Sequence, residues 1–180
     1  MSQLWVPVSQ ADHIDGPLDA PMTLVEYGDF ECPYCADNYV VIKALQDTMG
    51  QDLRFVYRHF PLTRLHPHAE HAAEIAEAAD TIDRFWDMHD ILFENQRSLD
   101  DNHLLLDARA IGLDDDVARL AFEGAFSDRI KRDFRGGVRS GVKGTPCLFV
   151  NGQLYNGPRD VETIAAALED TMPDSSELDA

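Results

Sequence analysis

The two cysteines in the segment Cys32-Pro33-Tyr34-Cys35 are the residues of this sequence best suited to chemistry. They follow TLVEYGDF, residues 23–30, whose β-forming side chains predict a strand that ends in a loop. Pro33 suits the first position of a helix, so Cys32 would face the free N–H groups and positive dipole of a helix N-terminus. Both stabilise a thiolate, the nucleophile of thiol–disulfide exchange. Cys35, one turn later, could release the mixed disulfide, while Tyr34 could contact substrate or cover the pair.

Two other interpretations of the cysteine pair are coincidence and half of a zinc site. A structural zinc site usually has a second pair of closely spaced ligands, for which His66, His68 and His71 are the nearest candidates. We expect no metal there, because histidines are common on helix surfaces. Coincidence is the weaker explanation, since redox chemistry needs a strand-to-helix position for the pair.

Glu26 lies in the middle of the predicted strand, six residues before Cys32. If its side chain points inward, the carboxylate could exchange a proton with the Cys35 thiol, and burial would raise its pKa. The alternative is an exposed carboxylate without a role.

The Thr145-Pro146 bond precedes another predicted strand and could be cis. A cis-proline loop that faces the cysteine pair would leave the backbone of Thr145 free to pair with an extended substrate. Cys147 follows directly, either as a small buried residue or as a third redox partner.

The order of the predicted elements indicates one α/β domain with a helical block inside it. A helix with Val40, Val41, Leu45 and Met49 on its apolar side follows the cysteine pair and ends near Gly50. The next expected elements are a strand over 53–60, helices over 67–79, 82–95, 101–111, near 114–121 and through 130–138, strands over 147–150 and 153–155, and a helix over 161–168. Residues 1–22 are turn-rich, and residues 173–180 form an acidic tail.

The composition is that of a globular protein with a formal net charge of −18. This charge disfavours nucleic acid and anionic membrane surfaces as partners. No apolar run approaches the roughly 20 residues of a membrane span, and residues 1–10 do not resemble a secretory signal. We therefore expect a cytoplasmic protein, or a periplasmic one if a signal has been removed. Three cysteines are too few for a disulfide scaffold.

From about Asp12 to Leu168 the chain resembles the DsbA-like branch of the thioredoxin superfamily. The resemblance is carried by four stretches: DAPMTLVEYGDFECPYC, HFPLTRLHPHAEHAAEIAEAA, FWDMHDILFENQ and SGVKGTPCLFVNG. The chain is most similar to bacterial members without a signal and to domains fused behind some sodium/proton antiporters.

The resemblance implies a thioredoxin-like fold, residues 1–65 with 140–180, and an inserted all-helical domain, residues 66–139. It also implies that Cys32 is the exposed nucleophile and Cys35 the resolving thiol, with Glu26 as the buried acid. Pro146 would be the cis-proline, with Thr145 beside the sulfurs, and the expected substrate-binding residues are Pro33, Tyr34, Thr145 and Pro146. Glu31 and Asp29 are departures, because negative charges beside Cys32 should oppose thiolate formation.

We therefore expect a protein-disulfide oxidoreductase that acts on protein or small-molecule thiols and disulfides without a cofactor. Glu31 and the expected cytoplasmic location favour a reductase, although oxidase and isomerase remain open. The alternatives are a glutathione-dependent transferase or isomerase of the same architecture, and a non-enzymatic module whose cysteines hold a soft metal ion. The substrate, the redox potential and the oligomeric state do not follow from the sequence.

Overall fold

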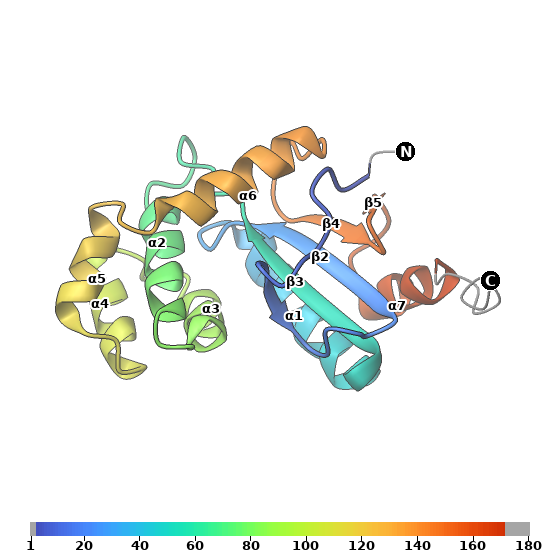
Figure 1. The fold of residues 1–180 in the computed structure, drawn as a ribbon, viewed down its shortest axis with the longest axis horizontal. Coiled ribbons are helices and arrows are strands. Elements are labelled where there is room, and N and C mark those ends of the chain that lie inside the picture. Colours follow the sequence, from blue (N-terminus) through green and yellow to red (C-terminus); the bar gives the residue numbers. More distant parts are fainter. Residues whose placement is uncertain (1–2, 172–180) are drawn as a thin grey trace.

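A mixed five-stranded sheet lies at the centre of the molecule in the computed structural model, which describes residues 3–171 (Figure 1). The strands follow the order β1-β3-β2-β4-β5. Their bounds are β1 His13–Asp15, β2 Met22–Gly28, β3 Leu53–His59, β4 Cys147–Val150 and β5 Gln153–Tyr155. β2 and β3 are parallel, and the other neighbours are antiparallel. The turn-rich interpretation of residues 1–22 missed β1, which is too short to show a period.

Helices cover both faces of this sheet. On one face, α1 (Pro33–Met49) and α7 (Val161–Asp170) pack against Leu24 and Leu148. On the other face, Phe134 of α6 (Ser127–Arg139) packs with the core around Val25. Every residue of β2 is buried as a result. A side chain on β2 is therefore buried whichever face of the sheet it points to.

Three of the four residues predicted on the apolar side of α1 face the core, because Leu45 is buried and Val41 and Met49 pack against the same cluster, but Val40 does not. The buried residues of α1 are Cys35, Asn38, Ile42 and Leu45, whereas Val40 is 66% exposed. Positions three or four apart share one face of a helix, so the inward position of Cys35 determines which residues follow it into the core. The predicted end of the helix is confirmed, since Gly50 follows Met49 with a φ of +50°.

Five consecutive helices connect β3 to β4 and form the group on the left of Figure 1, from which α6 returns over the sheet. The first four are α2 Ala69–Asp80, α3 Phe85–Glu94, α4 Asp101–Ala110 and α5 Asp115–Phe122. The helix predicted near 114–121 is confirmed, and Asp114 caps it, because its carboxylate accepts hydrogen bonds from the N–H groups of Asp116 and Val117. Within residues 3–171, no helix combines the length and the apolar composition needed to cross a membrane.

The core is continuous from the sheet into this helical block, with Tyr57, Met88 and Leu104 in one hydrophobic cluster. Met88 and Phe93 are buried and Trp86 is partly buried against this cluster, so the apolar side of α3 packs onto the core of the sheet. We propose the division into residues 1–65 with 140–180 and residues 66–139 as a description of topology. The predicted tail over 173–180 lies outside the described residues.

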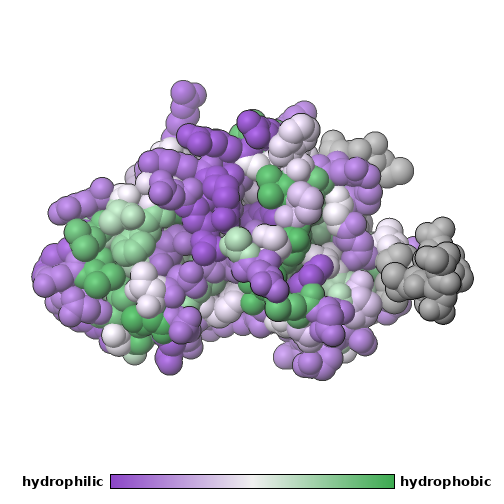
Figure 2. Space-filling model, viewed as in Figure 1, coloured by the Kyte–Doolittle hydropathy of each residue, from purple (hydrophilic) through white to green (hydrophobic). Residues whose placement is uncertain are grey.

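The surface carries the excess of acidic side chains. Figure 2 shows hydrophilic residues over most of one face, with hydrophobic residues in smaller separate patches. The 33 acidic residues outnumber the 15 basic ones. A net charge of this size keeps molecules apart in solution through mutual repulsion.

A buried polar network ties the helical block to the sheet. Glu77 of α2 accepts hydrogen bonds at one oxygen from His13 of β1 (2.6 Å) and His59 of β3 (2.8 Å). Its other oxygen pairs with Arg129 of α6 at 2.9 Å. These contacts lower the pKa of Glu77 against the effect of burial. The carboxylate therefore joins four separate elements as an ion.

Replacing Glu77 by glutamine should destabilise the fold, because the neutral amide leaves Arg129 without its buried counter-charge. We expect a loss of about 3 kcal/mol in the free energy of unfolding, measured by urea titration at neutral pH. The control is Glu70→Gln, which removes an exposed carboxylate from the same helix and should cost no more than about 0.5 kcal/mol. Equal stability of the two variants would contradict a structural role for the network.

Candidate active site

The start of α1 places both cysteines just beyond the C-terminal end of the central strand β2. Cys32 caps the helix in an extended conformation, and Pro33 is its first residue. The backbone N–H groups of Cys35 and Ala36 both donate to the carbonyl of Cys32, at 3.0 and 3.3 Å. Both cysteines are free thiols. A sulfur at this position meets the positive end of the helix dipole.

The pKa of Cys32 is lowered to about 5. The largest cause is a hydrogen bond with the Cys35 thiol, which outweighs the opposing effect of burial. The Thr145 side chain and the backbone N–H groups of Cys35 and Tyr34 lower this pKa further. At neutral pH the Cys32 sulfur is therefore a thiolate.

Cys32 is more enclosed than the resemblance implies, which is a correction to the expected exposed nucleophile. The residue is only 3% exposed. In its protonated form the thiol donates to the carbonyl of Thr145 at 3.3 Å, so the loop before β4 lies against the sulfur. Gln96 binds the carbonyl of Cys32 from the other side, at 2.8 Å. Tyr34 is 62% exposed, so it does not cover the pair.

Cys35 is the opposite of Cys32 in its acid–base character. It is fully buried, and burial raises its pKa well above the usual value. The Cys32 sulfur and the Glu26 carboxylate act in the same direction. One turn of helix thus separates a thiolate from a thiol that keeps its proton.

Glu26 is a buried acid beneath this turn. It is 2% exposed, and burial raises its pKa to about 8, with the charge at Cys32 as a further cause. Asn38, Arg159 and Cys35 act against this rise. The carboxyl group therefore changes charge near neutral pH, beside the thiol that must lose a proton. The exposed alternative for Glu26 is excluded.

The two acids before Cys32 are bound by other groups. Asp29 is buried and accepts hydrogen bonds from the N–H groups of Glu31 and Leu62 and from His66, at 2.7–2.8 Å. Glu31 accepts one from the N–H of His68 at 2.6 Å. These contacts stabilise the loop around the pair. The two carboxylates do not prevent the fall in the pKa of Cys32, contrary to the effect expected from the sequence.

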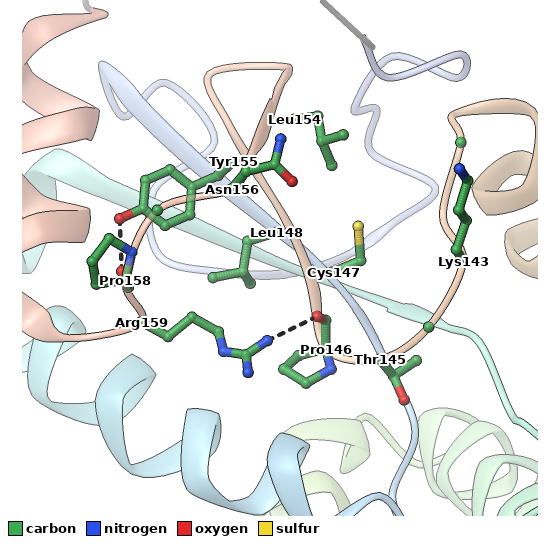
Figure 3. Close-up of a pocket in the computed structure, with 13 residues that line it drawn as sticks. Lys143, Thr145, Pro146, Cys147, Leu148, Leu154, Tyr155, Asn156, Pro158 and Arg159 are labelled. Atoms are coloured by element: carbon green, nitrogen blue, oxygen red, sulfur yellow. Dashed lines mark hydrogen bonds between the residues drawn. The ribbon is translucent and has the colours of Figure 1, made fainter.

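The Thr145–Pro146 peptide bond is cis. The hydroxyl of Thr145 is buried and has no conventional partner among the described residues, so it is available to donate to the Cys32 thiolate. Beside this loop lies a pocket of about 780 Å³, shown in Figure 3. Arg159 reaches across this pocket and donates to the carbonyl of Pro146 at 3.3 Å.

Cys147 belongs to the opposite face of the sheet. It packs with the cluster around Val25 and Phe149, whereas Cys32 and Cys35 belong to the other cluster. Figure 3 shows its sulfur pointing away from Thr145 and Pro146. Burial raises its pKa to about 11. This position favours the packing interpretation over a third redox partner.

Of the candidate metal ligands His66, His68 and His71, the first and the last are each hydrogen-bonded to a different carboxylate. His66 binds Asp29 and His71 binds Asp101, at 2.8 and 2.6 Å. Among residues 3–171, ligand atoms converge within 4.8 Å at His13, His59 and Glu77. There the hydrogen bonds from both histidines and the ion pair with Arg129 already occupy the carboxylate.

Three residues of the site were missed by the sequence analysis. Asn38 carries a signal, because it lies three residues after Cys35 and is a buried polar residue on the inner face of α1. Gln96 and Arg159 carry none. They come from the end of α3 and the loop before α7, and only the folded chain brings them to the cysteine pair.

The chain matches a family model described as Thioredoxin over residues 9–170. It is 44% identical over 169 residues to Na(+)/H(+) antiporter NhaA 1 of Salinispora arenicola, a match that covers 92% of this chain and 26% of that protein. The chain thus spans about a quarter of the length of this relative.

Two solved structures show the same fold. A thioredoxin-like oxidoreductase from Silicibacter pomeroyi superposes with a TM-score of 0.80 at 24% identity, covering 90% of this chain and 92% of that one. Oxidised BdbD from Bacillus subtilis gives a TM-score of 0.77 at 24% identity, covering 88% of this chain and 93% of that one.

These comparisons confirm the predicted thioredoxin-like fold and the likeness to domains of sodium/proton antiporters. The chain belongs to the thioredoxin family.

Proposed function

We propose that this protein is a thiol–disulfide oxidoreductase whose nucleophile is Cys32. The observation that carries the proposal is the opposite character of the two thiols, with the pKa of Cys32 lowered to about 5 and that of Cys35 raised by burial. A lone metal-binding pair does not require this asymmetry, whereas stepwise exchange does. The two solved structures of the same fold, a thioredoxin-like oxidoreductase and BdbD in its oxidised form, agree with redox chemistry.

In the first step, the Cys32 thiolate attacks one sulfur of a substrate disulfide. A bond forms between Cys32 and that sulfur, the substrate S–S bond breaks, and the leaving sulfur takes a proton from solvent. The contact between Cys32 and the Thr145 carbonyl is lost on ionisation, since a thiolate has no proton to donate. The hydroxyl of Thr145 then stabilises the anion, and the sulfur is free to engage the substrate.

In the second step, Cys35 transfers its proton to Glu26 and attacks the sulfur of Cys32. The enzyme disulfide forms, the mixed disulfide breaks, and the second substrate sulfur leaves as a thiolate that takes a proton from solvent. The substrate has gained two electrons and the cysteine pair has lost two. Run in reverse, the same steps oxidise a substrate dithiol. Asn38 and Arg159 position and polarise Glu26 for this proton transfer.

The low pKa of Cys32 stabilises the reduced pair and so favours transfer of the disulfide to substrates. This direction is opposite to the one that Glu31 suggests in the sequence. We propose an oxidising role on protein thiols, with Pro33, Tyr34, Thr145 and Pro146 as the surface that contacts the substrate. Tyr34 is exposed beside the pair, and Thr145 borders it from the loop before β4.

The cysteine roles are tested by insulin reduction with dithiothreitol. Cys32→Ser should reduce turnover to the uncatalysed rate, because no thiolate remains to attack. Cys35→Ser should accumulate mixed disulfides, seen as a mass increase that dithiothreitol reverses. Cys147→Ser, the matched control, should keep most of the activity. Equal turnover by wild type and Cys32→Ser would refute the proposal, and stoichiometric metal binding without turnover would support the metal-binding module instead.

The proton acceptor is tested by the pH dependence of mixed-disulfide resolution. Since only the ionised Glu26 can accept a proton, the rate should rise with pH and level off above about 8. Glu26→Gln should slow this step at least about tenfold at pH 8 and remove the inflection. Stopped-flow tryptophan fluorescence follows the step. Glu31→Gln, which removes a carboxylate beside the same pair, should keep the inflection; its loss there would assign the titration to Glu31.

A further inference from the structure

The pocket beside the cis-proline loop has an unusual charge for this protein. Lys143 and Arg159 are the only charged residues among those that line it, and none of the lining residues is acidic. The chain as a whole has 33 acidic and 15 basic residues. A pocket whose charged lining residues are all cations therefore departs from the acidic composition of the chain.

Both cations are available to a ligand. Lys143 and Arg159 are exposed, and within residues 3–171 neither forms an ion pair with a carboxylate. Figure 3 shows them on either side of Pro146 and Cys147, with Arg159 directed along the loop. An anion in this pocket would meet two positive charges, neither of which is in contact with a carboxylate of the described residues.

The loop connects this pocket to the nucleophile. Arg159 donates to the carbonyl of Pro146 at 3.3 Å, and the preceding carbonyl, that of Thr145, lies 3.3 Å from the Cys32 sulfur. An extended substrate advances about 3.3 Å per residue. A side chain within a few residues of the substrate cysteine could therefore reach the cations while its sulfur meets Cys32.

On the other side of the cysteine pair, acidic residues outnumber basic ones. A second pocket, of about 660 Å³, lies between the start of α1 and the end of α3 and includes Asp37, Glu94 and Arg97. Carboxylates are in excess there. A substrate chain that lies across the pair therefore meets different charges on its two sides.

Resting on the proposed function, we infer that Lys143 and Arg159 select substrate thiols and disulfides that carry a carboxylate close to the reacting sulfur. The substrate class is an acidic peptide segment around a cysteine, in a folded or unfolded protein or in a small peptide thiol. Lys143 and Arg159 act on specificity through charge and take no part in the bond-making steps.

The test follows the exchange in its reductive direction and compares two peptide disulfides that differ only in the residues beside the cysteine, glutamate in one and lysine in the other. We expect kcat/KM to be about threefold to tenfold higher for the acidic peptide at low ionic strength, with the ratio falling towards one in about 1 M salt. The charge reversals Lys143→Glu and Arg159→Glu should each lower the ratio, and the double variant should invert it. Lys131→Glu, an exposed lysine on α6, is the matched control and should leave the ratio unchanged.

The ratio is the informative quantity, because Arg159 also influences Glu26 and a change in chemistry affects both peptides alike. An equal rate for the two peptides, or a ratio that Lys131→Glu changes as much as Lys143→Glu, would overturn the inference. No turnover of either peptide would instead count against the proposed function. Glutathione disulfide serves as a third substrate: sensitivity to Lys143→Glu, at a residue without an effect on Glu26, identifies small peptide thiols as a source, and insensitivity identifies longer acidic segments.

Discussion

The hydrogen bond between the Cys35 thiol and the Cys32 sulfur is the interaction on which the site depends. It is the largest cause of the low pKa of Cys32, and it acts in the opposite direction on Cys35. A single proton is thereby held on the inner sulfur and kept off the outer one. The helix start supplies the geometry, because Cys32 caps α1 and Pro33 begins it without an N–H group of its own.

The rest of the fold encloses this pair and supplies the groups that surround it. β2 carries Glu26 in a strand buried on both faces, which raises the pKa of its carboxyl group to about 8. The loop before β4 places Thr145 against Cys32, and Gln96 ties the end of α3 to the same residue. The network of His13, His59 and Glu77 holds the helical block to the sheet, so that α3 stays in place.

The sequence predicted most of the elements and the place of the cysteine pair at the start of α1, because these depend on local patterns such as the apolar periods of the helices and the Cys32 to Cys35 spacing. It did not predict the enclosure of Cys32, which results from contacts with Thr145 and Gln96 far along the chain. Asn38 could have been found as a polar residue on the buried face of α1, had that face been assigned from Cys35 and not from Val40. The position of Arg159 follows only from the folded structure.

The most direct test of the account is the ionisation of Cys32, followed by the thiolate absorbance at 240 nm as the reduced protein is titrated. With the signal of Cys32→Ser subtracted, the midpoint should lie near pH 5. The other two thiols do not interfere, since the pKa of Cys147 is raised to about 11 and that of Cys35 well above 9.0. A midpoint near 9.0, the ordinary thiol value, would contradict the account.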